Sequence, residues 1–201
     1  GHDAAINMIR RLLQAGGGEV VHLGHHRSVA DIVRAAIQED ADGIAVSSYQ
    51  GGHNEYFAYM VDMLRELNSE HVRVVVGGGG TLAPAEIAAL EQHGIEKIYT
   101  PEHGRTLGLT GMIDDVLERV RVTRRPSYDF APLSPRDHRH IARTITALED
   151  AVQDDGSRAA ILRAIADHQA TTGIKRVPVI GLTGTGGAGK SSLNDELLQR
   201  F

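Results

Sequence analysis

The chain has 201 residues, of which 41% are hydrophobic and 23% charged, with 23 glycines, no cysteine and a formal net charge of −5. This composition suits a folded α/β protein of one domain and part of another. The lack of cysteine excludes disulfides and thiolate chemistry, and the net charge gives no reason to expect nucleic acid as a partner. No apolar run reaches the roughly 18 residues of a membrane helix. We read no secretory signal in the first residues and expect a cytoplasmic protein.

Strand and helix patterns alternate over residues 1–122. Apolar spacing predicts a helix that ends at Gly16, then helices over Val29–Glu39, Tyr56–Leu67, Pro84–Gln92 and Thr106–Val120, and strands over Glu19–Leu23, Gly43–Ser47, Arg73–Val76 and Lys97–Tyr99. Alternation of this kind predicts a parallel sheet with helices on both faces. The order favours a doubly wound, flavodoxin-like sheet whose first strand is central, and we expect that strand just before Gly1.

The pattern changes at Thr123. Prolines punctuate an extended linker, and two helices are then predicted over Arg136–Ala151 and Ser157–Thr171. We expect residues 123–176 to form this linker and a helical lead-in. Residues 177–201 then begin a nucleotide-binding domain with a strand over Val177–Gly181, and we expect that domain to continue beyond the segment.

A glycine-rich loop with the pattern G-x-x-x-x-G-K-S/T lies between that strand and a predicted helix, Ser192–Arg200. In such a loop, backbone N–H groups surround phosphate oxygens, and the helix dipole adds to the field. Lys190 is expected to bridge the β- and γ-phosphates, and Ser191 to hold Mg²⁺. The nucleotide-binding residues predicted from this motif are Gly184, Gly186, Gly187, Ala188, Gly189, Lys190, Ser191 and Ser192. The motif does not distinguish GTP from ATP.

Three further motifs follow the first domain's strands. Gly1-His2-Asp3 precedes the first helix, Ser47 to His53 follows one buried strand, and Gly79-Gly80 follows the next. All three are expected at the carboxyl ends of strands, the edge where doubly wound sheets bind ligands. The paired glycines would let the backbone come close to a flat or long ligand.

These motifs resemble the cobalamin-binding domain of adenosylcobalamin-dependent acyl-CoA mutases, whose pattern is D-x-H-x-x-G, then S-x-L, then G-G. The aspartate position falls before Gly1, Ala5 stands in place of a glycine and Tyr49 in place of a leucine. The resemblance implies that the benzimidazole tail of the cofactor leaves cobalt, enters a pocket in this domain, and is replaced on cobalt by the imidazole of His2. The cofactor contacts that it implies are His2, Asp3, Ala5, Ile9, Ser47, Tyr49, Gly51, Gly79, Gly80, Tyr99 and His103.

The helical lead-in from Ala142 to Glu149 resembles that of the small GTPase chaperones that serve these mutases. A cobalamin domain followed by such a lead-in and a phosphate loop resembles the fused isobutyryl-CoA mutases. That resemblance implies adenosylcobalamin, GTP and Mg²⁺ as cofactors, and radical interconversion of isobutyryl-CoA and butyryl-CoA. It also implies a homodimer and an acyl-CoA substrate bound by a domain outside this segment, so no catalytic residue is expected here.

Three alternatives compete with this interpretation. A cobalamin-dependent sensor or methyl-carrier module uses the same domain, but the phosphate loop argues against it. A receiver domain joined to an ATPase needs an acidic cluster at the strand ends, where this sequence has Ser47 and Gly77. A zinc site at His25, His26 and His53 has no further ligand at suitable spacing.

Overall fold

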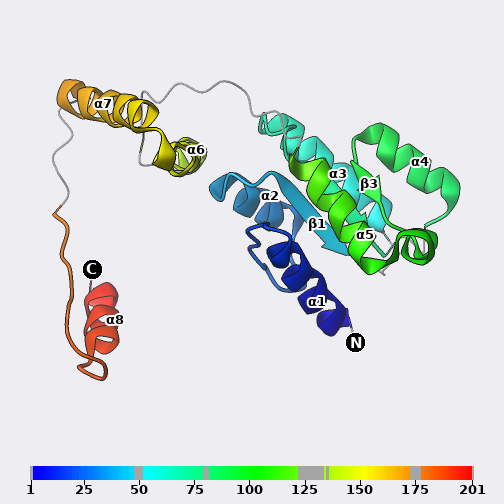
Figure 1. The fold of residues 1–201 in the computed structure, drawn as a ribbon, viewed down its shortest axis with the longest axis horizontal. Helices are drawn as coiled ribbons and strands as arrows, with labels where there is room; N and C mark the ends of the chain where they lie inside the picture. The colour runs from blue at the N-terminus through cyan, green and yellow to red at the C-terminus, as the bar shows by residue number, and fades with distance from the viewer. Residues whose placement is uncertain are drawn as a thin grey trace.

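The computed structural model describes residues 2–47, 52–78, 82–121, 134, 136–172 and 178–200, and for His2 and Asp3 it describes the backbone alone. Its elements are α1 (His2–Ala15), α2 (Val29–Gln38), β1 (Gly43–Ser47), α3 (His53–Glu66), β2 (Arg73–Gly77), α4 (Pro84–His93), β3 (Lys97–Ile98), α5 (Pro101–Arg121), α6 (His138–Asp150), a 3₁₀ turn (Ala151–Gln153), α7 (Asp155–Thr172) and α8 (Lys190–Arg200). Figure 1 follows them from α1 to α8 along the chain.

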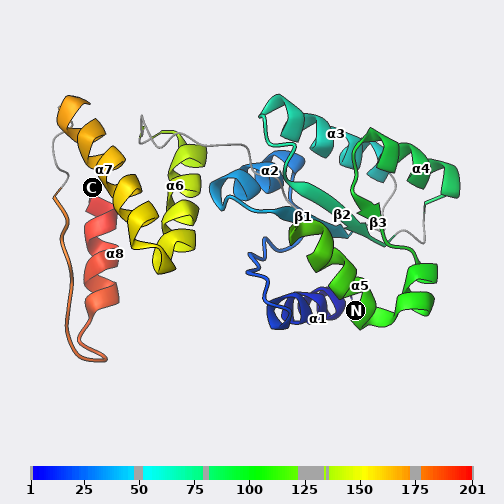
Figure 2. The same cartoon turned by 45° about the horizontal axis from the view of Figure 1, so that its top comes forward.

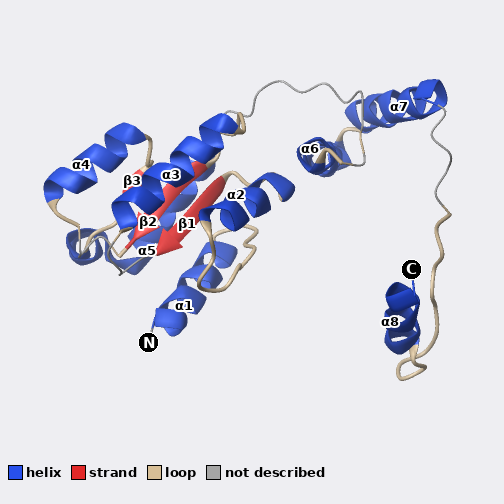
Figure 3. Cartoon of the chain, turned by 180° about the vertical axis from the view of Figure 1, so that it is seen from behind, coloured by secondary structure: helices blue, strands red, loops and turns tan. Residues whose placement is uncertain are grey.

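The three strands form a parallel sheet in the order β1-β2-β3. Helices α1 and α5 lie on one face of the sheet, and α2, α3 and α4 cover the other (Figure 2). Figure 3 shows the strands enclosed between these two helical layers from behind. This arrangement confirms the predicted α/β, flavodoxin-like class, because a parallel sheet buries both of its faces.

The core explains why the strands are apolar without alternation. In β2, Val74 and Val76 join the cluster beneath α2, α3 and α4, whereas Val75 between them points to the opposite face and is also buried. Phe57 and Met60 of α3 fill the larger cluster and are almost wholly buried. Burial of a side chain of this size stabilises a fold by about 1.5–3 kcal/mol.

The predicted strand over Glu19–Leu23 is wrong. Those residues form no strand, and the sheet has three strands where four were predicted. A parallel strand exists only where a neighbour supplies its hydrogen bonds. In the predicted order that neighbour is the strand expected before Gly1, and no described residue takes its place beside β1. Val21 within the segment is accordingly 53% exposed.

Helix α5 begins five residues before the predicted start at Thr106. Pro101 suits the first turn of a helix, since its missing N–H has no intrahelical partner there. Gly108, with φ of 66° and ψ of 176°, interrupts the helix and leaves a short first part before the long second one. The loss of hydrophobic periodicity at this glycine hid the first part from the sequence pattern.

The lead-in forms two helices, as predicted, with α6 capped by the side chain of Asp137, which accepts from the backbone N–H of His140 at 3.0 Å. Helix α6 packs against α2, and Arg139 donates to the carbonyl of Leu67 just after α3. Within the described part of the chain, no helix combines the length and apolarity that a membrane span requires.

The strand predicted over Val177–Gly181 is also wrong where the structure describes it, from residue 178 onward. Val179 and Ile180 are 94% and 80% exposed. An apolar segment of this kind becomes a strand only when a sheet pairs with it, and the described residues offer none. The helix after the loop does form, and it begins at Lys190, two residues earlier than predicted.

Candidate functional site

The carboxyl ends of the three strands lie side by side. Ser47 at the end of β1 pairs with Gly77 at the end of β2, and the N–H of Tyr99, just after β3, donates to the carbonyl of Val76 at 2.8 Å. The segments that carry the motifs therefore leave the sheet at neighbouring points of one edge. This is the edge at which an open parallel sheet binds ligands.

Tyr99 is fixed by a hydrogen-bond network with α5. Its hydroxyl donates to Asp115 Oδ2 at 2.6 Å, and Arg119 Nε donates to the same oxygen at 3.0 Å. Arg119 Nη1 also reaches Glu96 Oε1 at 3.1 Å. Burial raises the pKa of Tyr99, and the hydrogen bond to Asp115 raises it further. Tyr99 therefore stays a neutral phenol with its hydroxyl committed to α5, so only its ring is available to a ligand.

His103, in the first turn of α5, is held in one tautomer. Its Nδ1 accepts from the backbone N–H of Thr100 at 3.0 Å, and the Thr100 hydroxyl lies 2.9 Å from the same nitrogen. A backbone N–H can only donate, so Nδ1 carries no proton and the neutral ring carries it on Nε2. The ring lies edge-on to Tyr99, with centroids 6.0 Å apart. His103 thus supplies an N–H donor at this edge.

Helix α1 packs against the second part of α5. Its last turn contacts the last turn of α5, where Arg121 Nη2 donates to the carbonyl of Gly16 at 2.7 Å and Leu117 packs against Leu13. His2 and Asp3 were expected before the first helix, but they lie in its first turn.

Of the remaining residues on α1, Ala5 is exposed, and Ile9 is partly buried against the small cluster between α1 and α5. Tyr49, Gly51, Gly79 and Gly80 lie outside the described residues. The structure therefore brings together the strand-end residues Ser47 and Tyr99 with His103, and the contribution of the other cofactor contacts stays a prediction.

The described part of this edge fits the nucleotide tail of a cobalamin. A methyl group built on Gly77 would meet the Ser47 hydroxyl at 3.7 Å, so the two strand ends leave a surface of backbone and one hydroxyl there. The Tyr99 ring and the Nε2–H of His103 add an aromatic wall and a donor. Aromatic stacking and a few polar groups are what a benzimidazole nucleotide requires.

The phosphate loop takes its shape from local contacts. Gly187 and Gly189 have φ of 76° and 78°, conformations that side chains other than glycine rarely adopt. The N–H of Ala188 donates to the carbonyl of Thr185 at 3.3 Å, and helix α8 follows from Lys190. The loop and helix N-terminus thus form with no strand beside them among the described residues.

Lys190 reaches back over this loop. Its Nζ donates to the carbonyls of Gly184 at 2.7 Å and of Thr185 at 2.6 Å, which places the ammonium at the loop mouth. A methyl group built on Gly186, Gly187 or Gly189 would meet nothing within 4 Å, so the backbone is open to an approaching group. Positive charge, open backbone N–H groups and a helix N-terminus fit a phosphate. Ser191 and Ser192 are exposed in the first turn of α8.

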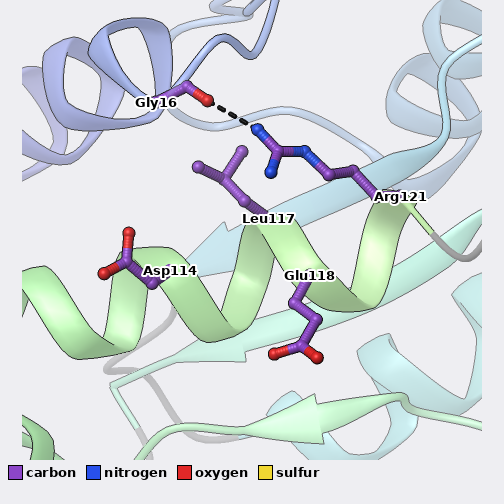
Figure 4. A pocket seen from close by; sticks show the side chains of 5 residues that line it. All are labelled: Gly16, Asp114, Leu117, Glu118 and Arg121. Atoms are coloured by element: carbon purple, nitrogen blue, oxygen red, sulfur yellow. Dashed lines mark hydrogen bonds between the residues drawn. The ribbon is translucent and has the colours of Figure 1, made fainter.

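A cavity lies at the opposite edge of the sheet. It has a volume of about 430 Å³ and is lined by Gly16, Asp114, Leu117, Glu118 and Arg121 (Figure 4). Two exposed carboxylates and the side chain of Arg121, which closes onto Gly16, border it. None of the predicted site residues lines it, and it has no part in the site at the strand ends.

Sequence patterns missed the residues that hold the site residues in place. Asp115 and Thr100 fix Tyr99 and His103, while Glu86 links the start of α4 to Asn54 of α3. One signal was available for Glu86, because a glutamate three residues into a helix reaches back to the first N–H. The partners of Tyr99 and Asn54 lie 16 and 32 residues away and have no local signature.

Comparison with known proteins identifies a matching family. Residues 1–121 match the B12 binding domain. Over its whole length the chain is 52% identical to the fused isobutyryl-CoA mutase of Geobacillus kaustophilus and 51% identical to that of Cupriavidus metallidurans. It is also 30% identical over 98 residues, covering 49% of the chain and 71% of the relative, to the 2-hydroxyisobutanoyl-CoA mutase small subunit of Aquincola tertiaricarbonis. The chain spans about a fifth of the length of the two fused mutases, 19% and 18%.

Proposed function

Because the chain belongs to the B12-binding domain family, we propose that its residues 1–122 bind adenosylcobalamin, with the imidazole of His2 as a ligand of cobalt. Residues 123–176 link this domain to a GTPase domain that starts with residues 177–201. In the whole protein these parts serve an acyl-CoA mutase that interconverts isobutyryl-CoA and butyryl-CoA.

One observation favours this function over the alternative functions. The identity of 51–52% to fused isobutyryl-CoA mutases extends over the entire chain, and so includes the lead-in helices and the phosphate loop beyond residue 121. A cobalamin-dependent sensor or methyl carrier would share the first domain alone. The joint presence of both segments in one chain therefore favours the fused mutase.

The chain's own residues bind and orient the cofactor. Ser47, the Tyr99 ring and the Nε2–H of His103 line the edge that receives the nucleotide tail, and Gly79 and Gly80, outside the described residues, are further predicted contacts. The imidazole of His2 would hold the cobalt. Adenosylcobalamin, when bound, supplies the carbon-centred radical by homolysis of its cobalt–carbon bond. The acyl-CoA is bound by a domain outside this segment, in a homodimer.

Lys190 and Ser191 serve a different step. The Lys190 ammonium, now held by two carbonyls, exchanges them for phosphate oxygens of GTP, and the Ser191 hydroxyl holds Mg²⁺. We assign this site to the loading or protection of the cofactor. A radical site must exclude water, and a hydrolysing domain joined through α6 and α7 can open and close it.

The ligand role of His2 is tested by replacing it with alanine in the full-length protein. His2→Ala is expected to lose the absorption signature of histidine-ligated cobalamin and to bind cobalamin at least about ten-fold more weakly, since a metal ligand is removed. His138→Ala, which changes an exposed histidine at the start of α6, is the matched control. An unchanged spectrum and affinity for His2→Ala would remove His2 from the site.

A further inference from the structure

The side chain of Tyr99 is fixed at both of its ends. At the backbone, the N–H of Tyr99 donates to the carbonyl of Val76 at 2.8 Å, which ties the residue to β2. At the tip, its hydroxyl donates to Asp115 Oδ2 on α5 at 2.6 Å. With a hydrogen bond at each end, the direction in which the ring points is set by the sheet and by α5 together.

The oxygen that accepts from Tyr99 is itself held in place. Arg119 Nε donates to the same Asp115 oxygen at 3.0 Å, and Arg119 Nη1 donates to Glu96 Oε1 at 3.1 Å. The other oxygen of Glu96 pairs with Arg73 of β2 at 3.4 Å. The hydrogen bond from Arg119 lowers the pKa of Asp115, which is therefore an anion at neutral pH. Hydrogen bonds to an ionised acceptor are the strong ones, so a chain of strong contacts runs from Tyr99 back to the sheet.

A break in α5 brings a second residue against the same ring. His103, in the first part of α5, lies edge-on to Tyr99 with ring centroids 6.0 Å apart, whereas Asp115 lies in the second part. A straight helix would separate residues 103 and 115 by about 18 Å along its axis. The interruption at Gly108 sets the two parts at an angle (Figure 2). Asp115 thus fixes the tip of the ring, while His103 limits its rotation about its long axis.

The fixed ring lies where a ligand would meet it. Tyr99 directly follows β3, at the edge formed by the strand ends, and it is half-buried. Its hydroxyl is engaged with α5, so the ring is the surface that it offers to a flat group. A side chain that is already ordered loses less conformational entropy on binding than one that the ligand must order. A rigid ring at this point therefore favours a ligand that stacks on it.

We propose that Asp115 is a positioning residue that holds the Tyr99 ring in the orientation in which it stacks against the nucleotide tail of cobalamin. This inference rests on the proposed function. Asp115 acts through Tyr99 and not on the ligand, because its accepting oxygen is engaged with Tyr99 and Arg119. Its removal should therefore weaken the binding of corrinoids that have a tail and leave the binding of those without one unchanged.

The experiment compares adenosylcobalamin with adenosylcobinamide, which carries the same adenosyl group but no nucleotide tail, by absorption titration of the full-length protein. Asp115→Ala is expected to bind adenosylcobalamin about three- to ten-fold more weakly, since the ligand must then order the ring. Its affinity for adenosylcobinamide should stay within about two-fold of wild type. Tyr99→Phe, which keeps the ring but removes the hydroxyl, should give a similar loss. The double variant should be no weaker than either single variant, because both changes break one hydrogen bond.

Two further variants separate positioning from loss of charge or of fold. Asp115→Asn keeps an oxygen that can accept from Tyr99 and Arg119 but loses the charge, so it should retain most of the affinity for adenosylcobalamin. Asp114→Ala removes the exposed carboxylate of the neighbouring residue and should change neither affinity. Thermal unfolding of each variant checks that it is folded.

Four outcomes would overturn the inference. Equal losses for the two corrinoids in Asp115→Ala would mean a general structural role, and unchanged affinity for both would mean no role. A loss in Asp115→Asn as large as that in Asp115→Ala would mean that the charge matters and not the bond to Tyr99. Additive losses in the double variant would mean that Asp115 and Tyr99 act separately. A wild-type protein that binds neither corrinoid would instead overturn the proposed function and this inference with it.

Discussion

Two segments of the chain place an apolar run before a glycine-rich loop, and they differ in what they need to take shape. In β2 the run is buried, with Val74 and Val76 each 1% exposed between two helical layers. Before the phosphate loop the corresponding Val179 and Ile180 are 94% and 80% exposed and form no strand. The phosphate loop and its helix nevertheless form, and Lys190 bonds to the loop.

The phosphate loop and the strand-end site differ in how far apart in the sequence their contacting residues lie. The phosphate loop is held by hydrogen bonds between residues at most six apart in sequence, so glycine conformations and one lysine are enough. The strand-end site depends on the pairing of Ser47 with Gly77 and of Val76 with Ile98, on neighbouring strands. We call the phosphate loop the local site, because its own motif determines its shape. We call the strand-end site the distributed site, because its shape depends on the sheet and on the residues that hold its segments in place.

The largest effect is expected from the local site. Lys190→Ala in the full-length protein should reduce GTP hydrolysis by about 10²–10³-fold, because a single ammonium aimed at the phosphates stabilises the charge that develops there. Mutase turnover of enzyme already loaded with cofactor should remain largely intact, while cofactor delivery or repair after inactivation should fail. Parallel assays of GTP hydrolysis and of preloaded turnover measure the two effects.

Arg200→Ala is the matched control, since Arg200 lies at the far end of α8 and pairs with Glu196 at 3.2 Å. It should leave hydrolysis within about two-fold of wild type. If Lys190→Ala stops the preloaded enzyme at once, nucleotide takes part in the catalytic cycle and the assignment to cofactor loading is wrong.

An intermediate effect is expected at the distributed site. Gly80→Val should weaken cobalamin binding by about ten- to hundred-fold, because two added methyl groups and a branched β-carbon occupy space left for the cofactor tail. Equilibrium titration measures the loss, and the unfolding temperature should stay near that of wild type. Cobalamin affinity equal to that of wild type would place the tail elsewhere.

Sequence patterns predicted the fold class because Val74 to Val76 and the residues around them are apolar on both faces of a strand. They failed for Glu19–Leu23, whose pattern suits a strand but whose pairing depends on a neighbour that lies outside that pattern. A residue pattern records burial preference, whereas a strand also requires a partner for its backbone.

The same reason limits the prediction of the site. The phosphate loop could be read from a continuous motif, and its structure agrees with that motif in the glycine conformations and the start of α8. The contact between Asn54 and Glu86 could not be read, because it joins two helices that the sheet brings together. The hydrogen bond between Tyr99 and Asp115 likewise depends on how α5 packs beside β3.

The smallest effect is expected from a substitution of Asp115, which holds Tyr99 in the distributed site. The substitution tests whether the contribution of Asp115 to the free energy of unfolding can be measured without changing a residue that contacts the ligand. The hydrogen bond from Arg119 lowers the pKa of Asp115, and the bond from Tyr99 adds to this shift. A carboxylate with a lowered pKa in the folded state adds stability above its unfolded pKa of about 3.9 and loses it as the pH falls through the folded value. Asp115→Asn should therefore lower the free energy of unfolding by about 1 kcal/mol at pH 7. That difference should shrink as the pH falls below about 4.

Asp114→Asn changes the same charge on the exposed neighbouring residue and should cost little at either pH. A loss for Asp115→Asn that persists unchanged at low pH would show that Asp115 acts through packing and not through its ionised hydrogen bonds.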